Sequence, residues 1–255
     1  MYNWYYIWSP KYEIFHQILS NSMVYASDFS LHPIFAEQSI FTRKASDGHA
    51  FTGISIKLFM IIKALRQHKD EYVICSDADL VILDKDALAK YLDTYKADIT
   101  CMRDTVNEDS VYNIGFMLIK STDETIALFE TVYERIRAEC GHDQTIFNEE
   151  IQSFSGTHEF FSMPEIVQSN MTVLDETLLV QCLCSLADSD MAMVEKLWSV
   201  SMFFDISYYK YLIPKKVLAI LILTCKENDP LNYIAAWKLE HIDEYLVPPV
   251  ASHDE

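Results

Sequence analysis

Tight turns favour glycine and proline, and this chain has little of either. It contains five glycines and seven prolines among 255 residues. Barrels and propellers built only from strands need many such turns, so their scarcity argues against these folds. Half of the residues are apolar, which excludes general disorder and is enough for a full hydrophobic core.

Basic residues are also scarce. Twenty lysines and arginines stand against 38 aspartates and glutamates, which leaves a formal charge of −18 at pH 7. Nucleic-acid phosphates and anionic membranes repel such a protein, so we expect no nucleic-acid partner. A substrate that carries phosphate would need local positive charge, from a metal ion or from a few well-placed lysines and arginines.

The sequence contains no apolar run long enough to span a membrane. The apolar segments 2–8 and 217–224 fall far short of the roughly 20 residues that a spanning helix needs. Segment 2–8 also lacks the basic leader of a signal peptide. We therefore expect no membrane insertion.

The cysteines show no Cys-x-x-Cys spacing, and several lie inside apolar runs. This usage is typical of reduced thiols in a protein core, so we expect a cytoplasmic location. The six positions are Cys75, Cys101, Cys140, Cys182, Cys184 and Cys225.

Strand-like and helix-like segments alternate along the first two hundred residues, which is the pattern of an α/β layer fold. The expected strands are 2–8, 23–26, 72–77, 97–102, 112–119, 160–163 and 171–174. The expected helices are 12–19, 51–68, 85–95, 121–140 and 143–151, with a further, mainly helical region over 177–204. Ser121 and Glu124 have the spacing of a capping box at the start of helix 121–140.

The chain changes character at Pro214-Lys215-Lys216. Segment 217–224 has the composition of a buried strand that begins a new unit, and segment 233–245 has the composition of a helix. An α/β domain begins in this way, but few residues follow. We therefore predict one domain over residues 1–213, and in residues 214–255 the start of an incomplete second domain or a C-terminal appendage.

The most informative segment is Tyr-Val-Ile-Cys-Ser-Asp-Ala-Asp, residues 72–79. A buried strand that stops at Asp77 and Asp79 presents both carboxylates at the carboxyl edge of a sheet, where open α/β folds bind their ligands. Hard divalent cations take carboxylate oxygens and then accept phosphate oxygens as further ligands. The pair therefore indicates a metal-bridged diphosphate, and the competing interpretation is a solvated turn whose aspartates cap backbone donors.

Four short patterns follow one another in a single order. They are Gly53-Ile-Ser-Ile-Lys57, Ser76-Asp-Ala-Asp79, Tyr112-Asn-Ile-Gly115, and Asp143-Gln144 followed by Asn148. The ordered set resembles the GT-A class of nucleotide-diphospho-sugar transferases over residues 1–205. With its aromatic first strand and compact size, the chain more narrowly resembles the N-terminal domain of multidomain glycosyltransferases from large algal (chlorella) viruses. The resemblance implies a Rossmann-like GT-A fold, with a mixed, mainly parallel central sheet flanked by helices.

The resemblance also assigns residues to the donor and the metal. It implies that Asp77 and Asp79 hold Mn²⁺ or Mg²⁺ against both phosphates of the donor, with His158 or water as a further metal ligand. Lys57 would reach the donor sugar or phosphate from the preceding helix. The donor-binding set that we expect is Trp8, Ser9, Lys57, Ser76, Ala78, Asn113 and Gly115.

The implied catalytic pair is Asp143 and Gln144, beside the anomeric carbon. Asp143 would stabilise the positive charge of an oxocarbenium ion, and Gln144 would orient hydroxyls. The implied reaction transfers a sugar from a UDP-sugar, such as UDP-glucose or UDP-rhamnose, to a glycan or glycoprotein acceptor, with retention. If the chain is viral, it would act in the host cytoplasm.

Each assignment has a structural alternative. Lys57 would then be a solvated lysine, and Asp143 a helix N-cap after Gly141. A haloacid-dehalogenase-type phosphatase is a rival function, because Asp77-Ala-Asp-Leu-Val81 fits its nucleophile motif. That family places the motif at the start of its fold and needs a later acidic pair, for which Asp188 and Asp190 are the candidates. A domain that binds a nucleotide sugar without transfer is the other alternative.

Overall fold

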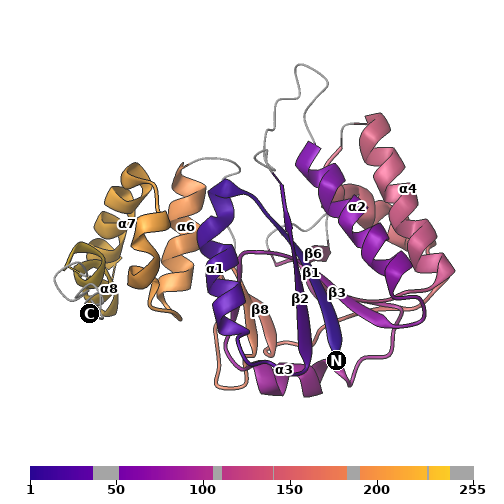
Figure 1. The fold of residues 1–255 in the computed structure, drawn as a ribbon, viewed down its shortest axis with the longest axis horizontal. Helices are drawn as coiled ribbons and strands as arrows, with labels where there is room; N and C mark the ends of the chain where they lie inside the picture. The colour runs from indigo at the N-terminus through magenta and orange to yellow at the C-terminus, as the bar shows by residue number, and fades with distance from the viewer. Residues whose placement is uncertain (37–51, 106–110, 140, 183–189, 229, 242–255) are drawn as a thin grey trace, which may run out of the picture. The chain divides into compact units, whose positions relative to one another are not determined.

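The computed structural model describes residues 1–36, 52–105, 111–139, 141–182, 190–228 and 230–241 (Figure 1). The chain divides into two compact units, residues 1–182 and 183–255. The predicted domain boundary at residue 213 stays a prediction. None of the described helices is long and apolar enough to cross a membrane.

A six-stranded sheet forms the centre of the first unit. Its order is β2 (Phe29–Phe35), β1 (Tyr2–Trp8), β3 (Tyr72–Asp77), β6 (Tyr112–Lys120), β5 (Ile99–Arg103) and β7 (His158–Phe160). Strand β6 runs antiparallel to both of its neighbours, and the other neighbouring pairs are parallel. The expected mixed, mainly parallel sheet is therefore confirmed.

The first unit also contains a smaller sheet of three strands. Its order is β4 (Leu80–Ile82), β9 (Leu179–Gln181) and β8 (Ile166–Gln168), with β4 antiparallel and β8 parallel to β9. Because β4 begins soon after β3 ends, Asp77 to Asp79 lie at the junction of the two sheets.

Helices flank the central sheet as the apolar periodicity predicts. They are α1 (Glu13–Ser22), α2 (Thr52–Gln67), α3 (Lys85–Leu92), α4 (Asp123–Glu139) and α5 (Asp143–Glu150), with short 3₁₀ turns at Pro10–Tyr12 and Ile151–Ser153. Figure 1 shows α2 and α4 together on one side of the sheet and α1 on the other. The buried side chains of α2, Leu58, Ile61 and Leu65, recur at helical spacing and pack with Val73 and Met117 of the sheet.

The described part of the second unit is helical. It contains α6 (Asp190–Ser201), a 3₁₀ segment at Ile206–Leu212, α7 (Lys215–Asn228) and α8 (Pro230–His241). The strand predicted over 217–224 is therefore wrong. Its buried residues, Val217, Leu221 and Cys225, recur every four positions, which is the spacing of one helix face. A short apolar run does not by itself separate a strand from a buried helix.

Four further predictions about local structure are corrected. The second strand is 29–35 and not 23–26, because α1 continues to Ser22 and turns follow it. Strand 160–163 is 158–160 instead, and 171–174 is not a strand, whereas Ile166–Gln168 forms β8. Region 177–204 contains β9 as well as α6. Three-residue strands have too little periodicity to be recognised in a sequence.

The cap of helix α4 is Thr122 and not Ser121. The hydroxyl of Thr122 accepts the Thr125 backbone N–H at 3.1 Å, and the Thr125 hydroxyl accepts the Thr122 N–H at 2.9 Å. Ser121 is buried and donates to the carbonyl of Leu65 at 2.6 Å. Thr122 and Thr125 therefore form the reciprocal cap, which was predicted one residue too early, at Ser121 and Glu124.

We expect Thr122→Ala to lower the free energy of unfolding by about 1 kcal/mol, because it leaves the Thr125 N–H without its cap. Urea denaturation followed by circular dichroism measures this change. The control is Thr131→Ala, an exposed threonine that bonds Ala127 O within the same helix, and its effect should stay within about 0.5 kcal/mol. Equal losses in the two variants would contradict the assignment of the cap.

Candidate active site

The two aspartates of the Asp-x-Asp motif lie at the carboxyl end of β3, as predicted. Asp77 ends the strand, and its side chain is 35% exposed. Asp79 is buried, and its carbonyl accepts the backbone N–H of Cys182 at 2.9 Å. The end of β9 therefore holds the segment that carries the motif.

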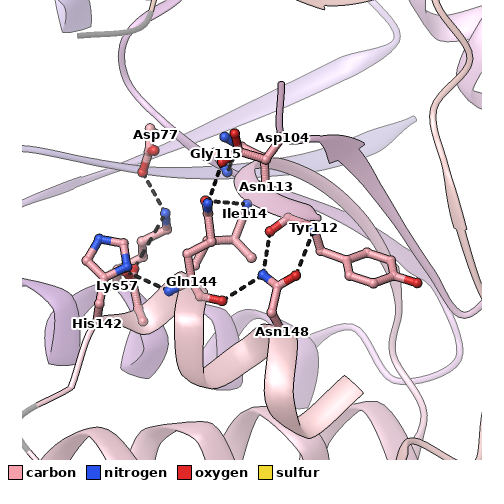
Figure 2. A network of polar contacts seen from close by, with 11 residues as sticks. Lys57, Asp77, Asp104, Tyr112, Asn113, Ile114, Gly115, His142, Gln144 and Asn148 are labelled. Atoms are coloured by element: carbon pink, nitrogen blue, oxygen red, sulfur yellow. Dashed lines mark hydrogen bonds and ion pairs between the residues drawn. The ribbon is translucent and has the colours of Figure 1, made fainter. Parts of the chain in front are cut away.

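Lys57 connects the motif to two helices. Its side chain projects from α2 and is buried, and its Nζ lies 2.7 Å from Asp77 Oδ1 and 4.0 Å from Asp143 Oδ2 (Figure 2). One ammonium group thus joins α2, the end of β3 and the start of α5. The alternative that Lys57 is a solvated lysine is wrong.

The charge of Lys57 is set by competing effects. Burial, the largest single effect, lowers its pKa, but attraction by Asp77, Asp143 and Asp79 outweighs burial and leaves the pKa above its usual value. The lysine is therefore a permanent cation at neutral pH. Three carboxylates lie close enough to stabilise it.

Asp143 is the first residue of α5, and it is not the N-cap. The cap position is His142, whose side chain makes no capping bond. Asp143 Oδ1 accepts the N–H of Gln144 at 2.9 Å, while its other oxygen faces Lys57. A carboxylate in the first helical turn is also stabilised by the helix dipole. The capping alternative for Asp143 is therefore wrong.

Amide side chains fix α5 against the start of β6. Gln144 Nε2 donates to Asp104 Oδ2 at 2.6 Å, and its Oε1 accepts the Ile114 N–H at 3.4 Å. Asn148 pairs with the backbone of Tyr112 through both ends of its amide, each at 2.8 Å (Figure 2). These bonds hold Asp143 in place, because they anchor the helix that begins with it.

The Asn-x-Gly pattern is a bulged segment of β6. The register between β5 and β6 shifts here, and buried Asn113 accepts the Gly115 N–H on its Oδ1 at 2.7 Å. A Cβ at position 115 would lie 1.7 Å from Gln181 Nε2. The carboxamide of Gln181 lies against the Cα of Gly115, so a side chain at position 115 would have to displace it.

Aromatic side chains gather at the carboxyl ends of β1 and β2. The ring of Trp8 stacks on His16, with ring centroids 4.3 Å apart. The ring centroid of Phe35, at the end of β2, lies 4.7 Å from that of Trp8. Burial lowers the pKa of His16, so this ring is neutral at pH 7. Buried Ser9 follows Trp8, and its Oγ has no hydrogen-bond partner within the described part of the chain.

Two expected donor-binding residues, Ser76 and Ala78, are buried. The Ser76 hydroxyl accepts the Trp4 indole N–H at 2.8 Å and donates to the carbonyl of Asp77 at 2.8 Å. These bonds give Ser76 a structural role in the fold. Contact of either residue with a donor stays a prediction.

The sequence profile of the nucleotide-diphospho-sugar transferases matches residues 63–211, more than half of the chain. The chain belongs to this family. A search of curated proteins finds no match.

Solved structures agree with this transferase assignment. A glycosyltransferase involved in glycosylation of the major capsid of PBCV-1 superposes with a TM-score of 0.56 at 9% identity, over 78% of this chain and 99% of that one. The glycosyltransferase GlyE of Streptococcus pneumoniae gives 0.51 at 11% identity, over 84% and 66% of the two chains. At such identities the similarity shows the fold, which is GT-A, and it confirms the expected resemblance to an algal-virus enzyme.

The phosphatase alternative does not fit the order of elements in the structure. Strands β1 and β2 and helix α2 all precede the Asp-x-Asp motif, which therefore does not open the fold. Asp188 lies outside the described residues, so the later acidic pair has no described geometry.

His158 does not lie at the edge where the motif ends. It pairs in register with Ile99, which is level with Ile119 and Val73, near the start of β3. Its Nδ1 is hydrogen-bonded to the Tyr112 hydroxyl at 2.9 Å. Among the described residues, no group of three or more His, Cys, Asp and Glu side chains is arranged to hold a metal ion. Asp77 and Asp79 fit a hard divalent cation by the chemistry of their oxygens, but they do not complete a coordination shell.

Sequence reasoning missed Asp104 and Gln181. Asp104 follows β5 at the same edge of the sheet, and that position after a strand was the only indication available. The sequence contains no indication of a role for Gln181, because its closeness to Gly115 comes from the pairing of β9 with β4.

We expect Lys57→Met to lower the free energy of unfolding by about 2–4 kcal/mol, since it leaves Asp77 and Asp143 without their shared cation. The range allows for partial solvent screening of Asp77. Chemical denaturation gives the value. The matched control is Lys63→Met, an exposed lysine on the same helix, with an expected change within about 0.5 kcal/mol. A Lys57→Met protein as stable as the Lys63→Met protein would show that the ion pairs are not structural.

Proposed function

We propose that the protein transfers a sugar from a UDP-sugar donor, of the UDP-glucose or UDP-rhamnose type, to a glycan or glycoprotein acceptor. The donor diphosphate would be held by Mn²⁺ or Mg²⁺ on Asp77 and Asp79. The observation that carries this proposal is the acidic cluster around Lys57 at the carboxyl end of β3. The donor class, the ion and the acceptor all go beyond family membership.

Charge balance supports the ion. Among the described residues, the carboxylates of Asp77, Asp79 and Asp143 all act on the single ammonium group of Lys57. A diphosphate adds further negative charge, in a protein whose net charge is −18. A divalent cation would offset negative charge between these carboxylates and the diphosphate, and when bound it would also stabilise the charge that develops on the leaving nucleotide.

The chain's own residues supply the rest of the proposed chemistry. Asp143 is fixed by Lys57 and by the Gln144 N–H, so its carboxylate is oriented before the donor binds. Such a preorganised charge stabilises positive charge that develops at an anomeric carbon. The Gln144 side chain is bonded to Asp104 and to Ile114, and we propose that it acts mainly by holding Asp143 in place.

The aromatic group at Trp8 supports a nucleobase site. Trp8 on β1 and Phe35 on β2 lie one and two strands away from Asp77, His16 of α1 stacks on Trp8, and stacking on such rings stabilises a planar base. Asn113 and Gly115 would line the sugar end of the donor. The Asp-Gln and Asn-x-Gly patterns resemble those of retaining enzymes, and they support transfer with retention.

We propose a cytoplasmic location, or the host cytoplasm if the protein is viral. The described cysteines, at positions 75, 101, 182 and 225, are buried and form no disulfide, which supports a reducing compartment.

We expect UDP to bind at least about tenfold more weakly in chelator than in Mn²⁺, because an acidic site repels an unaccompanied diphosphate. Calorimetry in the two buffers measures the difference. Asp79→Asn should abolish the Mn²⁺ effect and leave stability level or slightly higher, because it removes repulsion together with a ligand. Asp86→Asn, the loss of an exposed carboxylate on α3, should change nothing. Equal affinity in Mn²⁺ and chelator would reject the metal bridge.

Asp143→Asn separates binding from chemistry. We expect UDP affinity to stay nearly unchanged while turnover of a UDP-sugar falls on the order of a hundredfold, as for a group that acts mainly in the transition state. Steady-state kinetics and calorimetry on the same preparation give both values, with Glu149→Gln on the exposed face of α5 as the control. Unchanged turnover with lost UDP affinity would make Asp143 a donor-binding residue. No turnover by the wild type with any UDP-sugar would favour the non-catalytic alternative.

A further inference from the structure

The side chain of Gln181 ends in a buried oxygen that accepts no hydrogen bond from the part of the chain that the structure describes. The residue ends β9 and is 5% exposed, and its Oε1 has no hydrogen-bond partner among the described residues. A buried polar atom without a partner costs about 1–3 kcal/mol, so its presence needs an explanation. The other end of the same amide, Nε2, lies against the Cα of Gly115.

The position of this oxygen suggests what it binds. Gln181 pairs in register with Leu80, and the next residue, Cys182, donates its N–H to the carbonyl of Asp79 at 2.9 Å. The backbone of Gln181 is thus paired beside the Asp-x-Asp segment, and its side chain lies against the bulge at Gly115. Both segments border the proposed donor site.

We infer that Gln181 Oε1 is a protein ligand of the divalent ion, in addition to Asp77 and Asp79. This inference rests on the proposed function. Mn²⁺ and Mg²⁺ bind amide carbonyl oxygens as well as carboxylates. A neutral third ligand also suits a site that Asp77, Asp79 and Asp143 already make acidic, because it adds an oxygen without adding charge.

Gln168 offers a competing explanation. It pairs in register with Gln181, and its Nε2 is also buried and without a hydrogen-bond partner within the described chain. Its Oε1 accepts the Thr105 backbone N–H at 2.9 Å, so only the Nε2 end is available to Gln181. If the two amides served only each other, replacing either one would have the same effect and neither would change metal affinity.

The test measures Mn²⁺ affinity by electron paramagnetic resonance of the free ion, on the full chain with saturating UDP. We expect Gln181→Leu to weaken Mn²⁺ binding by about tenfold or more, at least the loss typical for a partner in the outer shell of a metal site. Gln181→Glu should bind Mn²⁺ at least as tightly as the wild type, because it keeps an oxygen and adds charge. Gln168→Leu, the matched control, should leave Mn²⁺ affinity unchanged.

The outcomes distinguish this inference from the proposed function. If the wild type binds no Mn²⁺ in the presence of UDP, both are overturned. If the wild type binds Mn²⁺ and Gln181→Leu binds it equally well, only the ligand assignment is overturned. Loss of UDP-sugar affinity at constant Mn²⁺ affinity would make Gln181 a contact to a sugar hydroxyl instead. If Gln181→Leu does not fold, Gln181→Glu decides, and Mn²⁺ affinity below that of the wild type would contradict the inference.

Discussion

The ammonium group of Lys57 is the constraint on which the site depends. Asp77 and Asp79 come from the end of β3 and Asp143 from the start of α5, and gathering them at one sheet edge without a cation would be strongly unfavourable. Lys57 makes the arrangement possible because its own helix, α2, packs on the sheet through Leu58, Ile61 and Leu65. The position of the charge is thus fixed by the hydrophobic core, and the positions of the acids are fixed by the charge.

The neutral amides around this cluster complete its rigidity. Gln144 and Asn148 tie α5 to the bulged start of β6, and Asn113 holds the bulge itself. Catalysis by charge stabilisation needs groups that do not reorganise when the substrate arrives. A site whose acids are held by the end of β3 and the start of α5 meets that condition, whereas a flexible loop would not.

Long periodic elements were predictable from the sequence. Strand 72–77 was found because an apolar run ends in charge, and helix α2 because its apolar residues recur at helical spacing. The ordered motifs led to Lys57, Asp77 and Asp143, which the structure places together. The partners of Lys57 were not predicted, since the sequence shows that a lysine is near the motif but not what it touches.

Other features could not be predicted because their causes are tertiary. Segment 217–224 has the composition of a strand and the burial pattern of a helix, and only packing decides between the two. Strands β8 and β9 exist through pairing and not through propensity. Gln181 becomes part of the candidate site only when β9 pairs with β4 beside Asp79.

Anomalous diffraction at the manganese edge, from crystals grown with UDP and Mn²⁺, tests directly whether Asp77 and Asp79 hold a metal ion against the diphosphate. We expect one manganese peak at the carboxyl end of β3, in contact with the motif aspartates and the diphosphate, with Lys57 still beside Asp143. UDP bound at this edge without manganese, or manganese bound away from Asp77 and Asp79, would contradict this expectation.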